Sequence, residues 1–338
     1  MKVIDDVPKD LWDQVVARCN YATFFHTSTW AEILAQTYPT MDIFTKGFAL
    51  DDGVVAIVPL VGTTERNRYF KWYESIYPGG YGGPVAERNL TQTEINYIFE
   101  HLPSAHTAYL HVMGNPYTLY DPPPSYRRSQ LYTQVLSLVE GFDAISKGLY
   151  KQKRQRIKKA REMGVEIGVA QTEEDFRSYY EVYEDSLRRW GDSTLISYPY
   201  ALFEQICRYG SDGVRLWIAE VDGEIISGSV NFYHNRYVIA WHQATRESHF
   251  RYHPVPLLKS EIIKDACQRG FSYYDLGPSG GLKGVEKFKQ EFGTQKMYFC
   301  SYAWNDNTLY HSYRKARNLV LRLLKGTIRA TEQESQGG

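Results

Sequence analysis

The order of helix and strand patterns is nearly the same in the two halves of this 338-residue chain. In the first half, apolar periodicity predicts a helix, three strands, a helix and two strands, at 29–38, 41–50, 54–62, 68–77, 91–102, 107–113 and 131–139. In the second half it predicts a strand, two helices, three strands, a helix and two strands, at 165–170, 172–190, 198–210, 214–221, 224–233, 236–245, 256–270, 271–277 and 297–304. This repeated order predicts an α/β (α+β) protein of two similar lobes, 1–141 and 142–306, followed by a C-terminal helix and tail at 307–338.

Capping and turn motifs support these boundaries. Thr29 with Glu32, and Thr172 with Asp175, have the spacing of capping boxes at helix N-termini. One strand pair in each half is separated by an Asp-Gly dipeptide, in "ALDDGVVAIVPL" and in "AEVDGEIISGSV". Such a dipeptide favours a β-hairpin, and in the second half it has the signature of a type I′ turn.

The composition excludes several classes of protein. Lys plus Arg and Asp plus Glu each number 39, so no global charge attracts nucleic acid or membrane. Four scattered cysteines without a CxxC pair predict a reducing compartment and no zinc site. The N-terminus lacks the basic and then apolar layout of a signal peptide, and the longest apolar stretch, "VVAIVPLVG", is too short to span a membrane. We therefore expect a cytoplasmic protein without a bound metal.

The stretch "YYDLGPSGGLKGVEKFKQEFG", 273–293, places a glycine-rich loop directly after a strand that ends at Asp275. A dinucleotide fingerprint requires a glycine where the chain has Ser279. A Walker A loop requires Gly-Lys where the chain has Leu282 and Lys283. The loop is therefore predicted to turn the chain sharply and not to bind a nucleotide.

The segment after this loop directs one lysine inward. Leu282, Val285, Phe288 and Phe292 fall on one helical stripe, and Lys289 lies on the same stripe. Lys289 either extends its amine to water or pairs with a specific anion, for which Asp275 is the candidate. The C-terminal edge of a strand is where α/β folds place ligands, so we predict a site here.

Other candidate site residues lie on neighbouring segments. The run 147–161 holds eight Lys or Arg and no acid, and is interpreted as a solvated helix face or as a contact for phosphate or RNA. Within it, Arg154 is predicted to point inward. His242 should share a strand face with Val238 and Ala240, as a core histidine or as a general base. Arg251 and His253 precede a helix N-terminus, where a donor phosphate can bind.

No nucleophile motif accompanies these residues, which favours direct transfer between two bound substrates. The chain resembles the GNAT N-acyltransferase fold, and within it the Fem-type branch, which holds the peptidoglycan-bridge aminoacyltransferases and relatives with an acetyltransferase domain. The resemblance depends on "FFHTSTWAEIL", "YPGGYGGPV", "LYKQKRQRIKKAREMGVEI" and the stretch 273–293, with its Asp-x-Gly strand end and Phe-Lys-x-x-Phe-Gly pattern.

This resemblance implies two tandem GNAT-like lobes, each with a mixed, mostly antiparallel sheet flanked by helices, and a cleft between them. It implies transfer of an acyl or aminoacyl group to an amine, in cell-wall or cell-surface precursor synthesis, from aminoacyl-tRNA or acyl-CoA without a tightly bound cofactor. Carried over, Lys289 stabilises the charge that develops on the transferred carbonyl, an electrostatic role. Asp275 and His242 complete the catalytic candidates, and the substrate-binding candidates are Phe288, Trp30, Tyr81, Arg154, Trp241 and Tyr274.

The chain departs from the family pattern at two places. The segment "RYHPVPLLK" lacks the glycines of the pyrophosphate loop that acetyl-CoA-dependent members carry before the central helix. The helical arm of some tRNA-dependent members has no room in "SLRRWGDSTLISYPYALF". The alternatives are an RNA- or ligand-binding relative that has lost catalysis, and an acetyl-CoA-dependent enzyme for a small molecule. A basic amphipathic helix at 311–326 is compatible with peripheral membrane contact and a lipid-linked amine acceptor.

Overall fold

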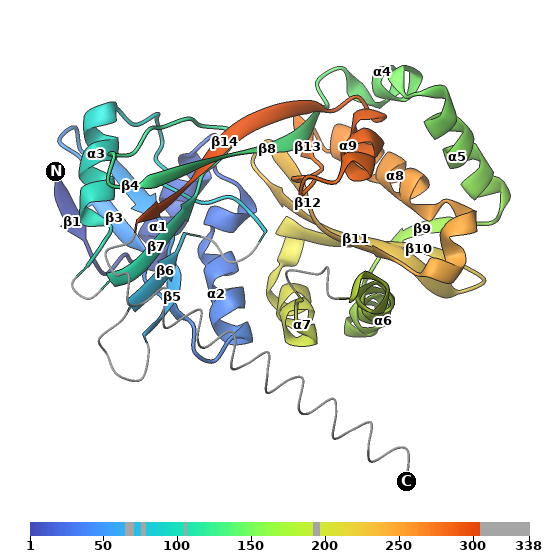
Figure 1. Ribbon diagram of the computed structural model, residues 1–338, viewed down its shortest axis with the longest axis horizontal. Helices are drawn as coiled ribbons and strands as arrows, with labels where there is room; N and C mark the ends of the chain where they lie inside the picture. Colours follow the sequence, from blue (N-terminus) through green and yellow to red (C-terminus); the bar gives the residue numbers. More distant parts are fainter. Residues whose placement is uncertain (65–70, 76–78, 105–106, 192–196, 305–338) are drawn as a thin grey trace, which may run out of the picture.

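One large sheet runs through both halves of the chain in the computed structural model, which describes residues 1–64, 71–75, 79–104, 107–191 and 197–304 (Figure 1). Across this 11-stranded sheet the order is β2 (Asp42–Ile43), β5 (Val61–Thr64), β6 (Lys71–Glu74), β7 (Thr107–Met113), β14 (Gln295–Trp304), β8 (Arg127–Ser137), β13 (Tyr273–Asp275), β12 (Tyr237–Thr245), β11 (Glu224–His234), β10 (Val214–Val221) and β9 (Glu166–Val169). A second, three-stranded sheet consists of β1 (Lys2–Ile4), β3 (Lys46–Ala49) and β4 (Val55–Val58).

The centre of the large sheet joins the two halves. Strand β14, the last in the described part of the chain, lies between β7 and β8 and pairs antiparallel with both. Strand β8 also pairs with β13. Among the described strands of this sheet, only β6 with β7 and β12 with β13 pair in parallel. The predicted α/β class with mixed, mostly antiparallel pairing is confirmed, and the large sheet contains strands of both halves.

Helices cover both faces of this sheet. The described helices are α1 (Lys9–Arg18), α2 (Ser28–Thr37), α3 (Gln92–His101), α4 (Gly141–Gly148), α5 (Lys151–Glu162), α6 (Glu173–Trp190), α7 (Tyr200–Tyr209), α8 (Pro254–Gln268) and α9 (Lys283–Gln290), with 3₁₀ turns η1 (Phe24–His26), η3 (Ser211–Gly213) and η4 (Glu247–Tyr252). In the second half, α4, α5, α8 and α9 lie on one side of the sheet and α6 and α7 on the other (Figure 1).

Three apolar clusters correspond to these layers. One packs α6 and α7 of the second half against α1, α2 and η1 of the first. A second fills the opposite face beneath α5 and α8. The third lies around α3 in the first half. The first cluster contains residues of both halves, so the two halves share a core. The division into lobes at residues 141 and 306 therefore stays a prediction.

The local motifs are confirmed with one exception. Thr172 accepts from the backbone N–H of Asp175, in a capping box. Asp222 and Gly223 have φ values of 52° and 78°, as the type I′ turn between β10 and β11 requires. The capping box predicted at Thr29 is wrong, because Thr27 is the cap and its hydroxyl accepts from the N–H of Trp30, two residues earlier than expected.

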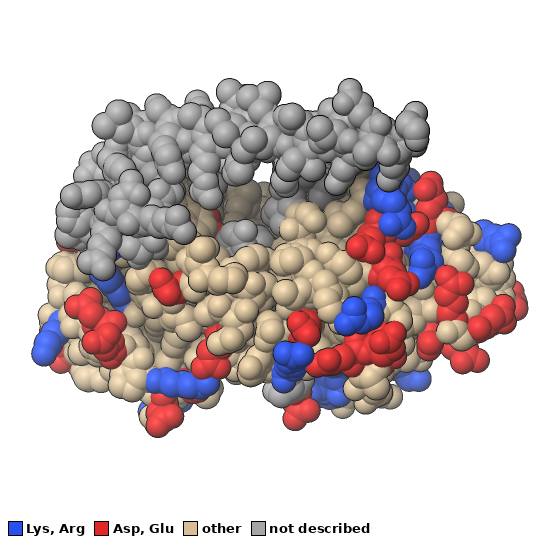
Figure 2. All heavy atoms as spheres, turned by 90° about the horizontal axis from the view of Figure 1, so that it is seen from below, with Lys and Arg blue, Asp and Glu red and all other residues tan. Residues whose placement is uncertain are grey.

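Figure 2 shows the charged side chains on one face of the described part of the molecule. Acidic and basic side chains are interspersed there, so this face has no large area of one sign. None of the helices in the described ranges is both long enough and apolar enough to cross a bilayer. The helix expected at 311–326 lies outside the described residues.

Candidate functional site

A cavity of about 580 Å³ opens where strands β12 and β13 separate. The two strands pair in parallel over only three positions, from Tyr237 opposite Tyr273 to Ile239 opposite Asp275. Beyond that point β12 continues, while the segment that follows β13 turns away at Gly277, whose φ is 78°. The predicted sharp turn is confirmed. Helices α8 and α9 contribute the walls, through Val255 and Lys259 and through Gly284, Val285, Phe288 and Lys289.

A β-bulge decides which side chains of β12 border the cavity. Val230 is opposite His242, but the next residue of β11, Asn231, is opposite Ala240, so Trp241 is an extra residue in β12. Alternation is interrupted there, and His242 faces α6 and α7 instead of sharing a face with Val238. The predicted face for His242 is wrong for this reason.

His242 is a buried core histidine that borders the cavity. Its Nδ1 is 2.7 Å from the hydroxyl of Tyr179, and its ring packs against Tyr183 and Phe203. Burial lowers the pKa of His242 to about 3. A general base works best when its pKa lies near the operating pH, so this environment does not favour His242 as a base at neutral pH.

Asp275 is completely buried and anchors the loop that follows it. Its carboxylate accepts from the hydroxyls of Tyr81 at 2.7 Å, Tyr117 at 3.0 Å and Thr133, and from the backbone N–H of Gly277 at 2.8 Å. Burial raises the pKa of Asp275, and these hydrogen bonds oppose the rise. Asp275 does not belong to the described lining of the cavity. Its contacts make it a residue that positions the cavity floor.

Lys289 is buried, as the sequence predicts, but its contacts are different. Its Nζ donates to the carbonyl oxygens of Gly277 at 2.7 Å and Pro278 at 2.9 Å. The expected ion pair with Asp275 is absent from the described contacts, because the turn after Asp275 places two loop carbonyls beside the amine instead. Burial lowers the pKa of Lys289 to about 8, while the charge of Asp275 opposes this. The predicted apolar stripe is partly wrong, since Leu282 is 63% exposed.

A second buried lysine, which the sequence analysis missed, borders the same cavity. Lys259 lies in α8, and its Nζ donates to Ser229 Oγ at 3.1 Å and to the hydroxyl of Tyr274 at 2.9 Å. Burial, and to a smaller extent the charge of Lys289, lowers the pKa of Lys259 to about 7. Helical periodicity could have predicted that Lys259 points inward, because it lies on the same stripe of α8 as Ile262, Ile263 and Ala266.

The inward residue of the basic helix α5 is Lys153 and not Arg154. Lys153 is completely buried, with its Nζ 3.0 Å from a carboxylate oxygen of Glu291 and 3.6 Å from the ring centroid of Phe288. Arg154 is exposed and donates to the carbonyls of Lys147 and Leu149 at the end of α4. The prediction for Arg154 is wrong because α5 begins after Tyr150, so its apolar stripe follows Lys153.

The aromatic candidates lie at different depths. Tyr81, Trp241 and Phe288 line the cavity. Trp30 is buried behind it and meets Trp241 with ring centroids 6.0 Å apart. Tyr274 lies beneath it and contacts the cavity through Lys259. Direct substrate contact is therefore compatible with three of these residues and not with Trp30 or Tyr274.

Arg251 and His253 lie at the start of α8, outside the described cavity lining. His253 is the N-cap residue, in left-handed conformation, and burial together with Lys159 and Arg156 of α5 lowers its pKa. Pro254 and Pro256 follow within the first turn and have no N–H to donate. This helix start therefore offers few backbone donors to a phosphate.

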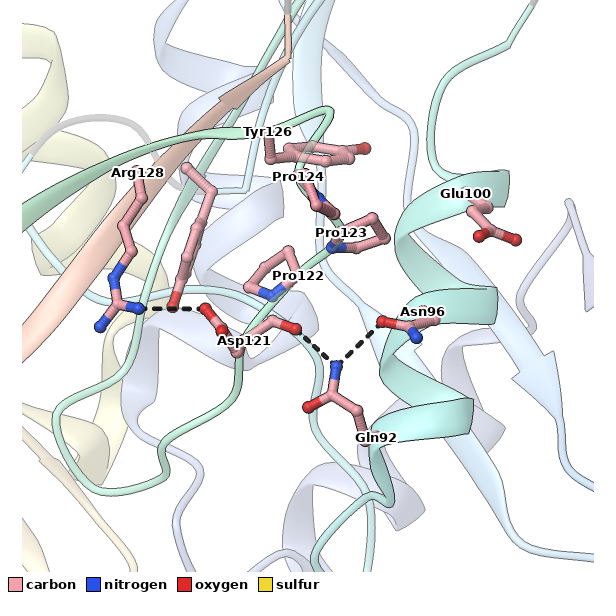
Figure 3. A pocket seen from close by; sticks show the side chains of 10 residues that line it. Gln92, Asn96, Glu100, Asp121, Pro122, Pro123, Pro124, Tyr126 and Arg128 are labelled. Atoms are coloured by element: carbon pink, nitrogen blue, oxygen red, sulfur yellow. Dashed lines mark hydrogen bonds and ion pairs between the residues drawn. The ribbon is translucent and has the colours of Figure 1, made fainter.

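Another cavity, of about 540 Å³, lies in the first half between α3 and the proline-rich connection (Figure 3). Its polar side chains bind one another: Gln92 donates to Asn96 and to the carbonyl of Asp121, and Arg128 pairs with the carboxylate of Asp121. No inward buried cation was found among its described lining residues. Among the described residues, no three His, Cys, Asp or Glu are grouped to hold a metal.

Comparisons with known proteins agree with this geometry. Residues 147–290 match the family model described as Acetyltransferase (GNAT) domain. No curated protein matches the chain at a significant level. Among solved structures, FemX is similar over 93% of this chain and 99% of its own, with a TM-score of 0.71 and 11% identity.

Two further solved structures share the fold at similar identity. One is the C-terminal domain of a putative lysylphosphatidylglycerol synthetase from Agrobacterium fabrum, with 12% identity, 95% and 96% coverage and a TM-score of 0.57. The other is L-PGS from Bacillus licheniformis, with 11% identity, 79% and 86% coverage and a TM-score of 0.51. The chain thus carries a GNAT acetyltransferase domain at 147–290 and as a whole has the fold of the Fem-like GNAT proteins.

Proposed function

We propose that the protein is an N-acyltransferase that moves an aminoacyl group to an amine acceptor in the cavity between β12 and β13. The single observation that carries this proposal is the buried Lys289, held by two loop carbonyls at the wall of the cavity in a GNAT domain. The two bound substrates react directly, without a covalent enzyme intermediate.

Lys289 supplies positive charge where negative charge develops. Attack of an amine on a carbonyl makes a tetrahedral oxyanion, and a fixed cation in a water-poor site stabilises it. Two carbonyl acceptors and the nearby charge of Asp275 keep the ammonium form favourable despite burial. Phe288 lines the same wall, and the buried Lys153 of α5 packs against its ring.

The donor we propose is an aminoacyl-tRNA and not an acyl-CoA. Two prolines in the first turn of α8 remove backbone donors that would otherwise cradle a pyrophosphate. Of the eight basic residues in 147–161, all except Lys153 are exposed, and Arg156 and Lys159 lie near the start of α8. An exposed basic helix beside the cavity suits a polyanionic donor, which binds through many phosphate contacts.

The acceptor we propose is an amine on a cell-surface precursor, small or lipid-linked, and the reaction is placed in the cytoplasm. The name of one structural neighbour, a putative lysylphosphatidylglycerol synthetase from Agrobacterium fabrum, motivates the lipid-linked form. Failure of the protein to float with anionic liposomes would remove the lipid-linked acceptor and leave the small one.

The test is a transfer assay with two donors and matched variants. Purified protein is incubated with a set of radiolabelled aminoacyl-tRNAs, or with acetyl-CoA, together with primary-amine acceptors. We expect product from an aminoacyl-tRNA. Lys289→Met should lower kcat by about 10²–10³-fold, the cost of removing one oxyanion-stabilising group. Lys287→Met is the control, because Lys287 is exposed on the same helix.

Two outcomes would contradict the proposal. Full activity in Lys289→Met would remove the catalytic assignment. If transfer occurs from acetyl-CoA alone and no tRNA is retained on a filter at low salt, the donor is an acyl-CoA and not an aminoacyl-tRNA. A binding-only relative predicts the opposite combination, with tRNA retained in a salt-dependent way and no transfer.

A further inference from the structure

We infer that Lys259 is the general base of the transfer reaction, taking the proton that the acceptor amine loses. This inference rests on the proposed function, since it assigns a second residue to the same reaction. It starts from the position of Lys259, whose side chain is only 3% exposed and borders the cavity from α8. Lys289 borders it from α9.

A closed hydrogen-bond ring holds the Lys259 amine in place. Lys259 donates to Ser229 Oγ and to the hydroxyl of Tyr274, Tyr274 donates to Asn231 Oδ1 at 3.1 Å, and Asn231 Nδ2 donates to Ser229 Oγ at 3.2 Å. Each of these residues is buried. The ring comes from three elements, β11, α8 and β13, and fixes the rotamer of Lys259 in an apolar core.

This ring leaves one position on the amine nitrogen. A lysine Nζ has three positions besides Cε, and Ser229 and Tyr274 occupy two of them. Because Lys259 lines the cavity, we place the third position on the cavity side. It holds a lone pair in the neutral amine and a proton in the ammonium. Proton exchange at Lys259 therefore happens on the side where substrates bind.

The two lysines of the cavity differ in what surrounds them. Lys289 has two carbonyl acceptors and the charge of Asp275 nearby, which favour its ammonium form. Lys259 has hydroxyl acceptors, and no described acidic side chain lines the cavity or bonds to it. Burial brings the pKa of Lys259 to about 7, within the range where a base works at neutral pH. Burial lowers the pKa of both lysines, to about 8 for Lys289 and about 7 for Lys259, so their different hydrogen-bond partners distinguish the roles. The carbonyl-bound Lys289 suits a fixed charge and the hydroxyl-bound Lys259 a base.

The chemical step balances as follows. The acceptor amine forms a bond to the carbonyl carbon of the donor, and the carbonyl electron pair moves to the oxygen, whose charge faces Lys289. Neutral Lys259 takes one proton from the new ammonium nitrogen. The oxyanion then re-forms the carbonyl and breaks the bond to the leaving group, which receives that proton from Lys259. An amide and a protonated leaving group result, and Lys259 is neutral again.

Three variants and a pH series test this assignment in the same transfer assay, with the aminoacyl-tRNA and acetyl-CoA donors and primary amines. Lys259→Met removes the base, and Lys259→Arg keeps the positive charge but cannot accept a proton. Both should lower kcat by about 10²–10⁴-fold and abolish the rise of kcat/KM around pH 7. Lys264→Met is the matched control, because Lys264 is exposed on the same helix.

Retention of more than about a tenth of the activity by Lys259→Arg would overturn the inference and favour a purely electrostatic role. An unchanged pH profile in Lys259→Met would overturn it as well. If neither variant folds, Tyr274→Phe replaces them. It removes one acceptor of the amine without changing charge, and should displace the rise of kcat/KM along the pH axis, whereas an unmoved rise would contradict the assignment.

A measurement without substrate separates this inference from the proposed function. In protein labelled with ¹³C at lysine Cε, the resonance missing from Lys259→Arg is followed by NMR from pH 5 to 11. We expect its midpoint at about 7, and a midpoint near 10.4, the unperturbed value, would overturn the inference. If the wild-type protein transfers nothing from either donor, the proposed function fails, while the NMR midpoint still decides whether a neutral amine faces the cavity.

Discussion

Acidification from pH 7 to pH 5 should destabilise the fold through three histidines, of which His26 and His242 are buried and His234 is half-buried. His26 in η1 and His234 at the end of β11 lie where the N-terminal helices meet the second half, and His242 lies beside the cavity. Burial lowers the pKa of His26 to about 4, of His234 to about 4 and of His242 to about 3. In the unfolded chain each has an ordinary pKa of 6.5.

The sign and size follow from linkage. Because the folded pKa is lower than the unfolded one, the unfolded state binds more protons as the pH falls below 6.5, and stability is lost. One pKa unit corresponds to about 1.4 kcal/mol, so at pH 5 each histidine lowers the free energy of unfolding by about 2 kcal/mol. The three together lower it by on the order of 6 kcal/mol, although His26 and His234 repel each other when charged and do not titrate independently. This is comparable with the whole stability of a typical domain, about 5–15 kcal/mol. Asp275 acts in the opposite direction, since its raised pKa makes protonation favour the folded state.

Urea unfolding at pH 7.0 and pH 5.0, followed by far-UV circular dichroism, measures the difference. His26→Asn keeps an acceptor where Nδ1 accepts from the backbone of Thr23 and cannot titrate. This variant should reduce the difference in the free energy of unfolding between pH 7.0 and pH 5.0 by about 2 kcal/mol, the contribution of one histidine. His101→Asn, at an exposed histidine, should leave this difference unchanged. A wild-type difference below about 2 kcal/mol, or an equal difference in His26→Asn, would refute this reasoning.

Three other predictions concern stability and packing. Asp275→Asn should lower the free energy of unfolding by about 3 kcal/mol, since at least one buried hydroxyl loses its charged acceptor; a loss below about 1 kcal/mol in urea titration would contradict the anchoring role. Lys153→Ala should cost about 3–5 kcal/mol because it leaves a carboxylate without its partner, whereas Arg154→Ala should cost under about 1 kcal/mol, and equal values would contradict the assignment of the inward residue. Gly228→Ala should cost about 1–3 kcal/mol, because its Cβ would lie 2.5 Å from the ring of Tyr179; thermal melts that match wild type would contradict this contact.

Local patterns in the sequence determine much of this protein. The order of helices and strands, the Asp-Gly turn at Asp222 and the inward Lys289 all follow from residues within one or two turns of each other. The same kind of pattern also marks Lys259, which lies on the apolar stripe of α8. Propensity, periodicity and turn chemistry act over such short distances, so the sequence alone shows them.

The tertiary structure alone decides what these residues contact. The tyrosines that bind Asp275 precede it by 194 and 158 residues, and no local pattern relates them. The bulge at Trp241 is set by the register of β12 against β11, and it moves His242 to the other face. Strand β14 pairs between β7 and β8, which brings the two halves into one sheet. Pairing between distant strands depends on the packing of the whole chain, and this packing places two lysines from α8 and α9 on one cavity.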